Sequence, residues 1–173
     1  GTSNFRAGVN AGNSIASGGN QNTVVGDEAG TAITTGDNNT AIGYAAGDAI
    51  TTAVESTAVG SQALSAVTTG NSNTAVGMNA GLAITTGSNN VAVGPYALTT
   101  MTTSDYNTAV GRAAGRYITT GFDNTLIGGL AGDALTDADY NTAIGKEALT
   151  SDTLGSRSTA VGWSALANQN FTS

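Results

Sequence analysis

The chain has no cysteine and no histidine among its 173 residues, and it has a single proline and only 5% aromatic residues. Without those two residue types it cannot form a Ser-His-Asp triad, a cysteine nucleophile or an ordinary zinc site. Charge is also scarce, with five Lys and Arg against twelve Asp and Glu and a formal net charge of −7. Nucleic-acid binding needs clustered cations. The basic residues are scattered, so we expect no nucleic-acid partner: Arg6, Arg112, Arg116, Lys146 and Arg157.

Long apolar runs are missing, and large core residues are scarce. The longest hydrophobic stretches span a few residues, so we expect no transmembrane helix and no insertion into a membrane. The start of the chain shows no signal-peptide pattern. It begins at Gly1, and we expect it to be a fragment of a longer fibre protein. With 25 glycines and little aromatic bulk, the composition favours an extended, repetitive β structure over a compact globule.

What the sequence has in abundance is repetition. The stretch "NTAVGMNAGLAITTG" at 73–87 returns as "NTAVGRAAGRYITTG" at 107–121, and the period throughout is seventeen residues. Nine in-register units fill residues 20–172, and a degenerate first copy occupies 2–18, followed by Gly19 as one extra residue. A fixed period of this kind is typical of stacked-repeat architectures. We therefore treat 1–173 as one repeat domain.

Each unit has the chemistry of one coil of a solenoid. "NTAVG" alternates as a short strand does, and the glycine that closes it is present in every copy, which indicates a positive φ or a close backbone approach. "AITT" is a second β-prone stretch, and "TG-x-N" is turn chemistry. The predicted fold is all-β, a parallel β-solenoid or β-roll of about ten 17-residue coils, spaced by about 4.8 Å. Equivalent Asn and Thr side chains would form ladders along it.

The coil interior is predicted to be thin and volume-conserving. An alanine follows each turn, and next to it stands either Gly, as at Gly30, with a large residue three positions later (Ile33), or Leu, as at Leu64, with Val67 later. One large side chain per coil is therefore expected. This regularity decays in the last two coils, where Asp152 takes the later position. A coil that buries so little apolar volume is only marginally stable as a single chain. This predicts oligomerisation as an intertwined or side-by-side homotrimer.

The repeat resembles known fibre proteins. "NNVAVG" at 89–94, "NNTAIG" at 38–43 and "NSNTAVG" at 71–77 are similar to the head repeats of trimeric autotransporter adhesins, which form a trimeric parallel β-roll. The longer "NTAVG…AL…TTG" unit looks even more like the repeats of phage tail fibres. The resemblance implies an extracellular, homotrimeric structural and attachment element. A virion tail fibre and a bacterial surface adhesin both stay open, with a host glycan or outer-membrane receptor as the outside partner.

Exposed aromatic residues are the candidate contacts for such a glycan. The variable positions after the strand glycine contain Tyr44, Tyr96 and Trp163, which are the residues we predict to contact a surface sugar. The alternative is that these rings cover apolar edges of neighbouring coils or chains. Tyr106, Phe122 and Tyr140 decorate the opposite turn. Receptor recognition could also belong to a tip outside these residues.

No catalytic, cofactor or metal site is predicted. A glycosidase needs two carboxylates converging on a cleft, whereas the acidic residues fall in turns of different coils, where they read as solvated: Asp27, Glu28, Asp48, Asp133 and Glu147. Calcium is the least firmly excluded ion, because 136–141 and 36–39 offer oxygen ligands, although neither has a full calcium-loop spacing. We expect the chain not to be an enzyme.

Ice binding is the remaining alternative. A row of threonines, beginning at Thr23 and Thr40 and repeating every coil, could order water. The row is interrupted at Val91. A broad ice-binding face would need two parallel threonine rows separated by one inward residue, and the adjacent "TT" pairs point to opposite sides. Fibre function is therefore preferred over ice binding.

Overall fold

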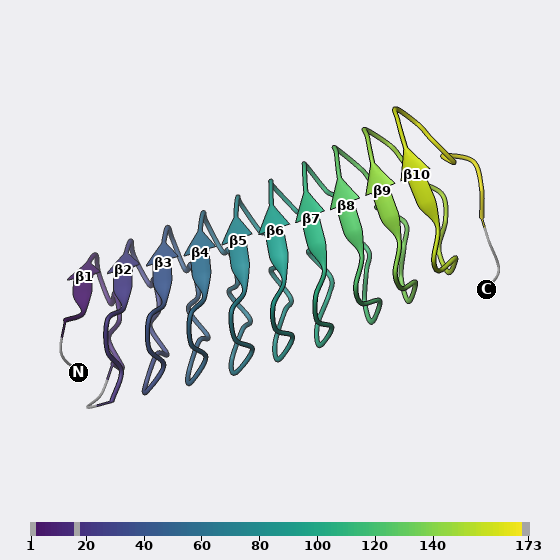
Figure 1. Ribbon diagram of the computed structural model, residues 1–173. Helices are drawn as coiled ribbons and strands as arrows, with labels where there is room; N and C mark the ends of the chain where they lie inside the picture. The colour runs from purple at the N-terminus through teal and green to yellow at the C-terminus, as the bar shows by residue number, and fades with distance from the viewer. Residues whose placement is uncertain (1–2, 16–17, 171–173) are drawn as a thin grey trace.

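The computed structural model describes residues 3–15 and 18–170 and contains no helix within them. It forms a rod of stacked coils, each contributing one three-residue strand to a single sheet (Figure 1). The strand consists of the "TAV" residues of each repeat, and the other residues of the repeat lead through turns to the strand of the next coil. The strands are β1 Phe5–Ala7, β2 Thr23–Val25, β3 Thr40–Ile42, β4 Thr57–Val59, β5 Thr74–Val76, β6 Val91–Val93, β7 Thr108–Val110, β8 Thr125–Ile127, β9 Thr142–Ile144 and β10 Thr159–Val161.

The sheet confirms the predicted parallel β-solenoid. Its ten strands follow chain order, from β1 to β10, and every neighbouring pair is parallel. Pairing runs between equivalent repeat positions, such as Thr40 with Thr57, so the register equals the seventeen-residue period. The first pair differs, because Phe5 pairs with Thr23 and Gly19 supplies the extra residue between them. The two described ends of the chain lie at opposite ends of the rod (Figure 1). Within the described ranges, no helix is long and apolar enough to cross a membrane.

The expected second strand of each coil does not form. The "AITT" stretch contributes bends and isolated hydrogen bonds, as in Thr34 N–H to the Thr51 carbonyl at 2.9 Å. The threonine hydroxyls of this stretch also donate to the carbonyl of the coil above, for example Thr51 Oγ1 to Thr68 O at 3.0 Å. Side-chain bonds of this kind compete with regular backbone pairing, which explains why a β-prone stretch stays irregular here.

The strand-closing glycines are required for both of the predicted reasons. Gly77 has a φ of 133°, and a Cβ added there would lie 2.7 Å from the carbonyl carbon of Gly94 in the next coil. Equivalent glycines stack on one another along the rod, as Gly94 does on Gly111. A side chain at this position would both force a conformation that L residues rarely adopt and push adjacent coils apart.

The interior shows how the two large-residue positions share one space. A Cβ at Gly30 would lie 2.8 Å from Ile33 Cδ1, so the isoleucine fills the volume that Leu64 fills in its own coil, where Val67 is smaller. The leucine accepts a left-handed backbone, with φ of 49° at Leu64. Such strain for a bulky residue is offset by burial, since Leu64 is fully buried.

The rule of one large side chain per coil is wrong for some coils. Leu98 and Met101 belong to the same coil and are both fully buried. Leu126 replaces the inward alanine of β8 and fills the space above two interior glycines, since a Cβ at Gly115 or at Gly132 would lie 2.8 Å from its methyl groups. Asp152 is also buried, and its Oδ1 accepts the Gly155 N–H at 2.9 Å.

A buried asparagine ladder joins the coils on the turn before each strand. The Asn39 amide donates to the Ala53 carbonyl at 2.8 Å, while its Oδ1 accepts the backbone N–H of Ser56 at 3.0 Å. The same pair of bonds recurs along the rod, with Ser56 as the one serine between asparagines. Because each amide satisfies a backbone donor and a backbone acceptor of other residues, the ladder fixes both the turn and the stacking. Its fully or nearly fully buried members are Asn22, Asn39, Ser56, Asn73, Asn90, Asn107, Asn124 and Asn141.

Candidate functional site

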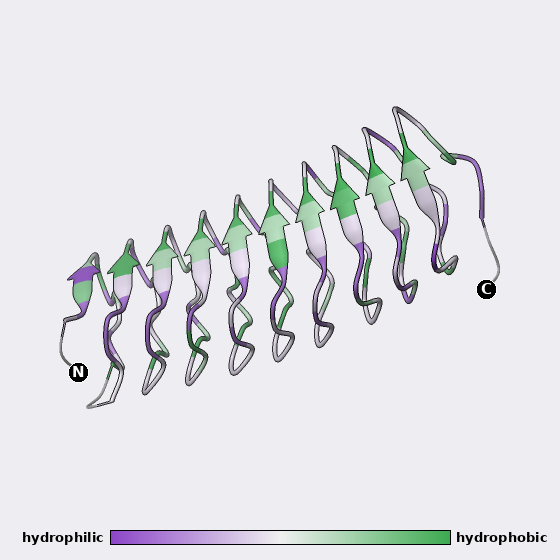
Figure 2. Cartoon of the chain, in the orientation of Figure 1, coloured by the Kyte–Doolittle hydropathy of each residue, from purple (hydrophilic) through white to green (hydrophobic). Residues whose placement is uncertain are grey.

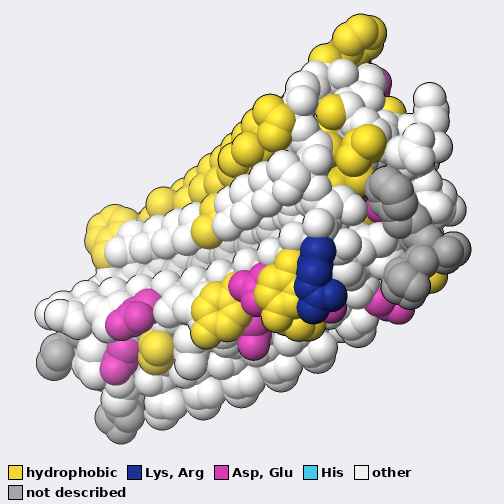
Figure 3. Space-filling view, turned by 45° about the vertical axis from the view of Figure 1, so that its right-hand side comes forward, with side chains coloured by type: hydrophobic (Ala, Val, Ile, Leu, Met, Phe, Trp, Pro, Cys, Tyr) yellow, Lys and Arg dark blue, Asp and Glu magenta, His cyan; other side chains and the backbone are white. Residues whose placement is uncertain are grey.

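The outer face of the sheet presents two parallel rows of side chains, which we call the strand face. In β2 to β10 the middle residue points inward and is buried, and the two flanking residues point outward, as in Thr74, Ala75 and Val76. The first outward row is threonine apart from Phe5 and Val91, and the second is Val or Ile in β2 to β10. Figure 3 shows a continuous stripe of hydrophobic side chains along the rod, and Figure 2 shows the apolar ends of β2 to β10 aligned.

The pattern predicted that the two parallel threonine rows of a broad ice-binding face are missing. The strand face has two outward rows separated by one inward residue, but Val or Ile stands in place of a second threonine row. The apolar row is only partly covered within the chain. Ile42, Ile127 and Ile144 are each 38% exposed, and Val161 at the end of the sheet is 65% exposed. A row of apolar side chains this regular is unusual for a surface that faces water alone.

The three predicted glycan contacts do not form one site. Tyr44 and Trp163 are 55% and 76% exposed, but they lie seven coils apart, a separation of about 34 Å at about 4.8 Å per coil. Tyr96 lies between them along the rod, and the Arg116 guanidinium is 5.7 Å from its ring centroid. Each ring could contact a ligand only by itself, so the predicted contacts with a sugar remain single residues rather than a cluster.

The opposite turn brings aromatic and acidic residues together in consecutive coils. Two neighbouring repeat positions hold Asp105 and Tyr106, then Phe122 and Asp123, then Asp139 and Tyr140. Acidic and aromatic residues therefore alternate both within each pair and from one coil to the next. We call these six residues the turn ledge. Two of its three rings contact each other, with Phe122 and Tyr140 in an edge-to-face arrangement at 5.1 Å. The Arg157 guanidinium lies 5.5 Å from the Tyr140 ring at one end of the ledge.

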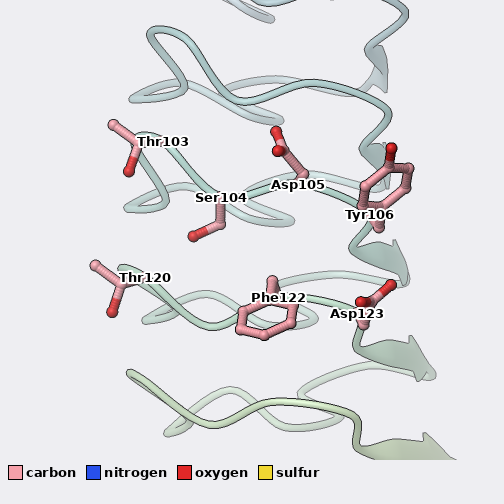
Figure 4. A pocket seen from close by; sticks show the side chains of 7 residues that line it. All are labelled: Thr103, Ser104, Asp105, Tyr106, Thr120, Phe122 and Asp123. Atoms are coloured by element: carbon pink, nitrogen blue, oxygen red, sulfur yellow. The ribbon is translucent and has the colours of Figure 1, made fainter.

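A hollow of about 410 Å³ opens on the turn ledge between two coils. Its lining is Thr103, Ser104, Asp105, Tyr106, Thr120, Phe122 and Asp123 (Figure 4). A second hollow of about 470 Å³ lies on another turn, lined by Arg112, Gly129, Leu130, Lys146 and Glu147. In the second hollow the Lys146 ammonium is paired with the neighbouring Glu147 at 3.1 Å.

The calcium candidates on the turns take part in bonds between coils. Asp137 accepts hydrogen bonds from the Thr119 and Thr120 hydroxyls, each at 2.9 Å, and Asp139 accepts the Phe122 backbone N–H at 3.0 Å. Among the described residues, no three carboxylates come close enough together to hold a metal ion. The oxygen-rich turns were visible in the sequence, but the hydrogen bonds that these carboxylates accept from the neighbouring coil were not.

The fold changes the titration of the Asp48 carboxylate. Burial raises the pKa of its side chain above the ordinary value of 3.8, with a smaller contribution from the nearby negative Glu28. Its Oδ1 is buried without a hydrogen-bond partner among the described residues. The sequence had placed Asp48 among the solvated turn carboxylates, and the partial burial of its side chain corrects that view.

Replacing Asp48 with asparagine should therefore change how stability depends on pH. The folded state binds the Asp48 proton more readily than the unfolded state, so the wild type loses stability as pH rises above about 4. We expect Asp48→Asn to be more stable at neutral pH, by less than about 1 kcal/mol because the side chain is partly exposed. The difference should shrink toward pH 3. Thermal unfolding at several pH values measures it, and a pH-independent difference would contradict the assignment.

The chain matches no protein-family model, no curated protein sequence and no solved structure. The resemblance of its repeats to fibre proteins therefore remains a prediction, and the functional argument below is built on the geometry of its surfaces.

Proposed function

We propose that this protein is a stiff structural segment of an extracellular attachment fibre, built from three copies that associate through their strand faces. The observation that supports this most directly is the unbroken row of Val and Ile along β2 to β10. A surface that repeats the same side chains every coil is complementary to another copy of itself over its whole length. Closed symmetry then allows a trimer with no open edge along the rod.

Stiffness follows from how the coils are joined. Every strand pairs with its neighbours, and the asparagine and threonine side chains add bonds between coils on the remaining sides. The rod therefore resists bending in several directions, whereas a simple chain of linked domains would flex at each linker. Such a segment would hold a binding end away from a particle or a cell. Nothing in this role requires catalysis, and the dispersed turn carboxylates support a non-enzymatic function.

Substituting a residue of the strand face should break the assembly. Val76 is 37% exposed in the middle of the row, and a Val76→Lys substitution would bring three ammonium groups together around a threefold axis. Desolvation and like-charge repulsion at such a position weaken association strongly. We expect the solution mass, measured by light scattering, to fall from that of a trimer to that of a monomer.

Met78→Lys is the matched control for that variant. Met78 is 44% exposed and lies two residues farther on, beyond the strand-closing glycine and outside the strand face. The same charge placed there should leave the mass unchanged. A wild-type chain that is monomeric at all concentrations, or an equal effect of the two substitutions, would refute the proposed assembly.

Ice binding is the second candidate, because the strand face carries a threonine row and a parallel Val and Ile row, separated by one inward residue. Threonine hydroxyls and Val or Ile methyl groups repeat at about 4.8 Å along the rod. The two functions compete for one surface, since a strand face buried between copies cannot contact ice. Thermal hysteresis by a monomeric wild-type protein, lost in Val76→Lys and retained in Met78→Lys, would favour ice binding over the fibre.

A further inference from the structure

The hollow on the turn ledge has no role in the stacking of copies through the strand face. It lies on the turn before the asparagine ladder, whereas the strand face lies beyond that ladder. Figure 3 likewise shows a band of mixed hydrophobic, acidic and basic side chains that is separate from the hydrophobic stripe. The ledge is therefore a surface that remains accessible when the proposed fibre assembles.

The lining of the hollow combines ring faces with groups that bond hydroxyls. Tyr106 is 59% exposed, and neither another ring nor a cation contacts its ring among the described residues. Phe122 lies one coil away and also lines the hollow (Figure 4). Aromatic faces hold the apolar C–H face of a sugar ring, and this arrangement leaves the hydroxyls at the edge of the sugar for hydrogen bonds.

The polar groups around those rings select the charge of the ligand. Asp105 and Asp123 provide carboxylates, and the hydroxyl groups come from Thr103, Ser104 and Thr120. No Lys or Arg lines the hollow. Two carboxylates in the lining repel phosphate, sulfate and uronate groups, whereas they accept hydrogen bonds from neutral hydroxyls or from an amino group.

The ledge is also held in place before any ligand arrives. Asp105 Oδ1 accepts the Ser88 backbone N–H at 2.6 Å, and Phe122 is braced by Tyr140 at 5.1 Å. The Asp123 carboxylate has no hydrogen-bond or ion-pair partner among the described residues, so it remains free to accept bonds from a ligand. Groups that are fixed in advance lose little freedom on binding.

We infer that the hollow between Tyr106 and Phe122 is a binding site for a neutral or amino-bearing saccharide, with the rings as stacking platforms and Asp123 as hydrogen-bond acceptor. The ligand class deepens the proposed attachment role and rests on it for its biological meaning. The binding itself requires only the two coils that form the hollow. The glycan contacts predicted from the sequence, Tyr44, Tyr96 and Trp163, lie on the turn after the strand and not on the turn ledge. The signal that identifies this site is the alternation of acid and ring at 105–106 and 122–123.

The test is nuclear magnetic resonance titration of the full chain with three kinds of oligosaccharide: neutral hexose oligomers, chitosan oligomers and sulfated oligomers. We expect chemical-shift changes confined to 103–106 and 120–123 with a neutral or amino-bearing oligomer, and none with the sulfated one. Phe122→Ala and Asp123→Asn should each weaken binding by about fivefold or more. Tyr44→Ala, which removes a ring that is more exposed than Phe122 from the other turn (55% against 37%), should leave the affinity unchanged.

The outcomes that test the saccharide site can be distinguished from those that test the fibre. Preferential binding of the sulfated oligomer, shift changes centred on Tyr44 or Trp163, or no binding by any oligomer at millimolar concentration would overturn the saccharide site. Solution mass, measured on the same samples, reports on the proposed assembly. A trimer that binds no saccharide refutes only this inference, and a monomer that binds through 103–106 and 120–123 refutes only the fibre.

Discussion

Gly77→Ala is expected to destabilise the rod by at least about 4 kcal/mol, or to prevent folding altogether. The added methyl group would lie 2.7 Å from the Gly94 carbonyl carbon and 2.9 Å from Pro95 N, both of which belong to the next coil. The backbone cannot withdraw without breaking the pairing of β5 with β6. The φ of 133° at Gly77 adds a conformational cost of about 1 to 3 kcal/mol. Thermal unfolding followed by circular dichroism, at equal protein concentrations, measures the loss.

The Gly162→Ala variant separates the conformational cost of the positive φ from the collision with the next coil. Gly162 has a similar φ of 126°, but the nearest atom to a Cβ added there is the Ala165 methyl carbon at 4.0 Å. This variant keeps the conformational cost and lacks the collision between coils. We expect a loss of about 1 to 3 kcal/mol. If the two glycine variants unfold at the same temperature, the close stacking of coils does not explain why glycine occupies this position in every repeat.

Asn107→Ala is expected to cost about 3 to 5 kcal/mol, the second largest effect. The Asn107 side chain is fully buried, its amide donates to Gly121 O at 2.9 Å, and its Oδ1 accepts the Asn124 backbone N–H at 3.1 Å. Truncation leaves a buried backbone carbonyl and a buried N–H without partners, each worth about 1 to 3 kcal/mol. It also leaves a void beside Met101, whose sulfur is 3.3 Å from the Asn107 amide nitrogen.

Two further variants test that explanation. Asn71 is exposed and its Oδ1 accepts the Val54 N–H at 2.9 Å, so water can replace it and Asn71→Ala should cost less than about 1 kcal/mol. Asn107→Ser should fall between the two alanine variants, because the natural Ser56 accepts the Asn73 N–H at 3.3 Å from the same repeat position. An Asn107→Ala cost equal to that of Asn71→Ala would show that the ladder contributes little.

The period of the repeat made much of the architecture predictable. Once residues seventeen apart are equivalent, a glycine that never varies must mark a stacked backbone position, and the φ of Gly43, Gly60 and Gly77 agrees with that reasoning. The exchange between Gly30 with Ile33 and Leu64 with Val67 was visible in the sequence because both partners lie in one coil, three residues apart. Local spacing is enough when the interacting residues repeat together.

Other features depended on contacts that the pattern does not specify. The sequence did not show that the "AITT" threonines would bond to carbonyls of the next coil instead of forming a strand. Nor did it show that Leu126 would fill the space beside Gly132 of its own coil and Gly115 of the preceding coil. Both outcomes are decided by which groups lie within reach across coils, and a one-dimensional repeat does not fix those distances.

By itself, the amino-acid sequence determined that this protein is a stack of equivalent β coils, because one seventeen-residue pattern recurs without interruption from 20 onward. Only the tertiary structure decided which side chains face outward together. It placed Val and Ile in one row beside threonine on the strand face, and it brought Tyr106 and Phe122 to one hollow while keeping Tyr44 and Trp163 apart. The physical reason is that a surface is formed by neighbouring coils, so its chemistry depends on the direction of each side chain in three dimensions.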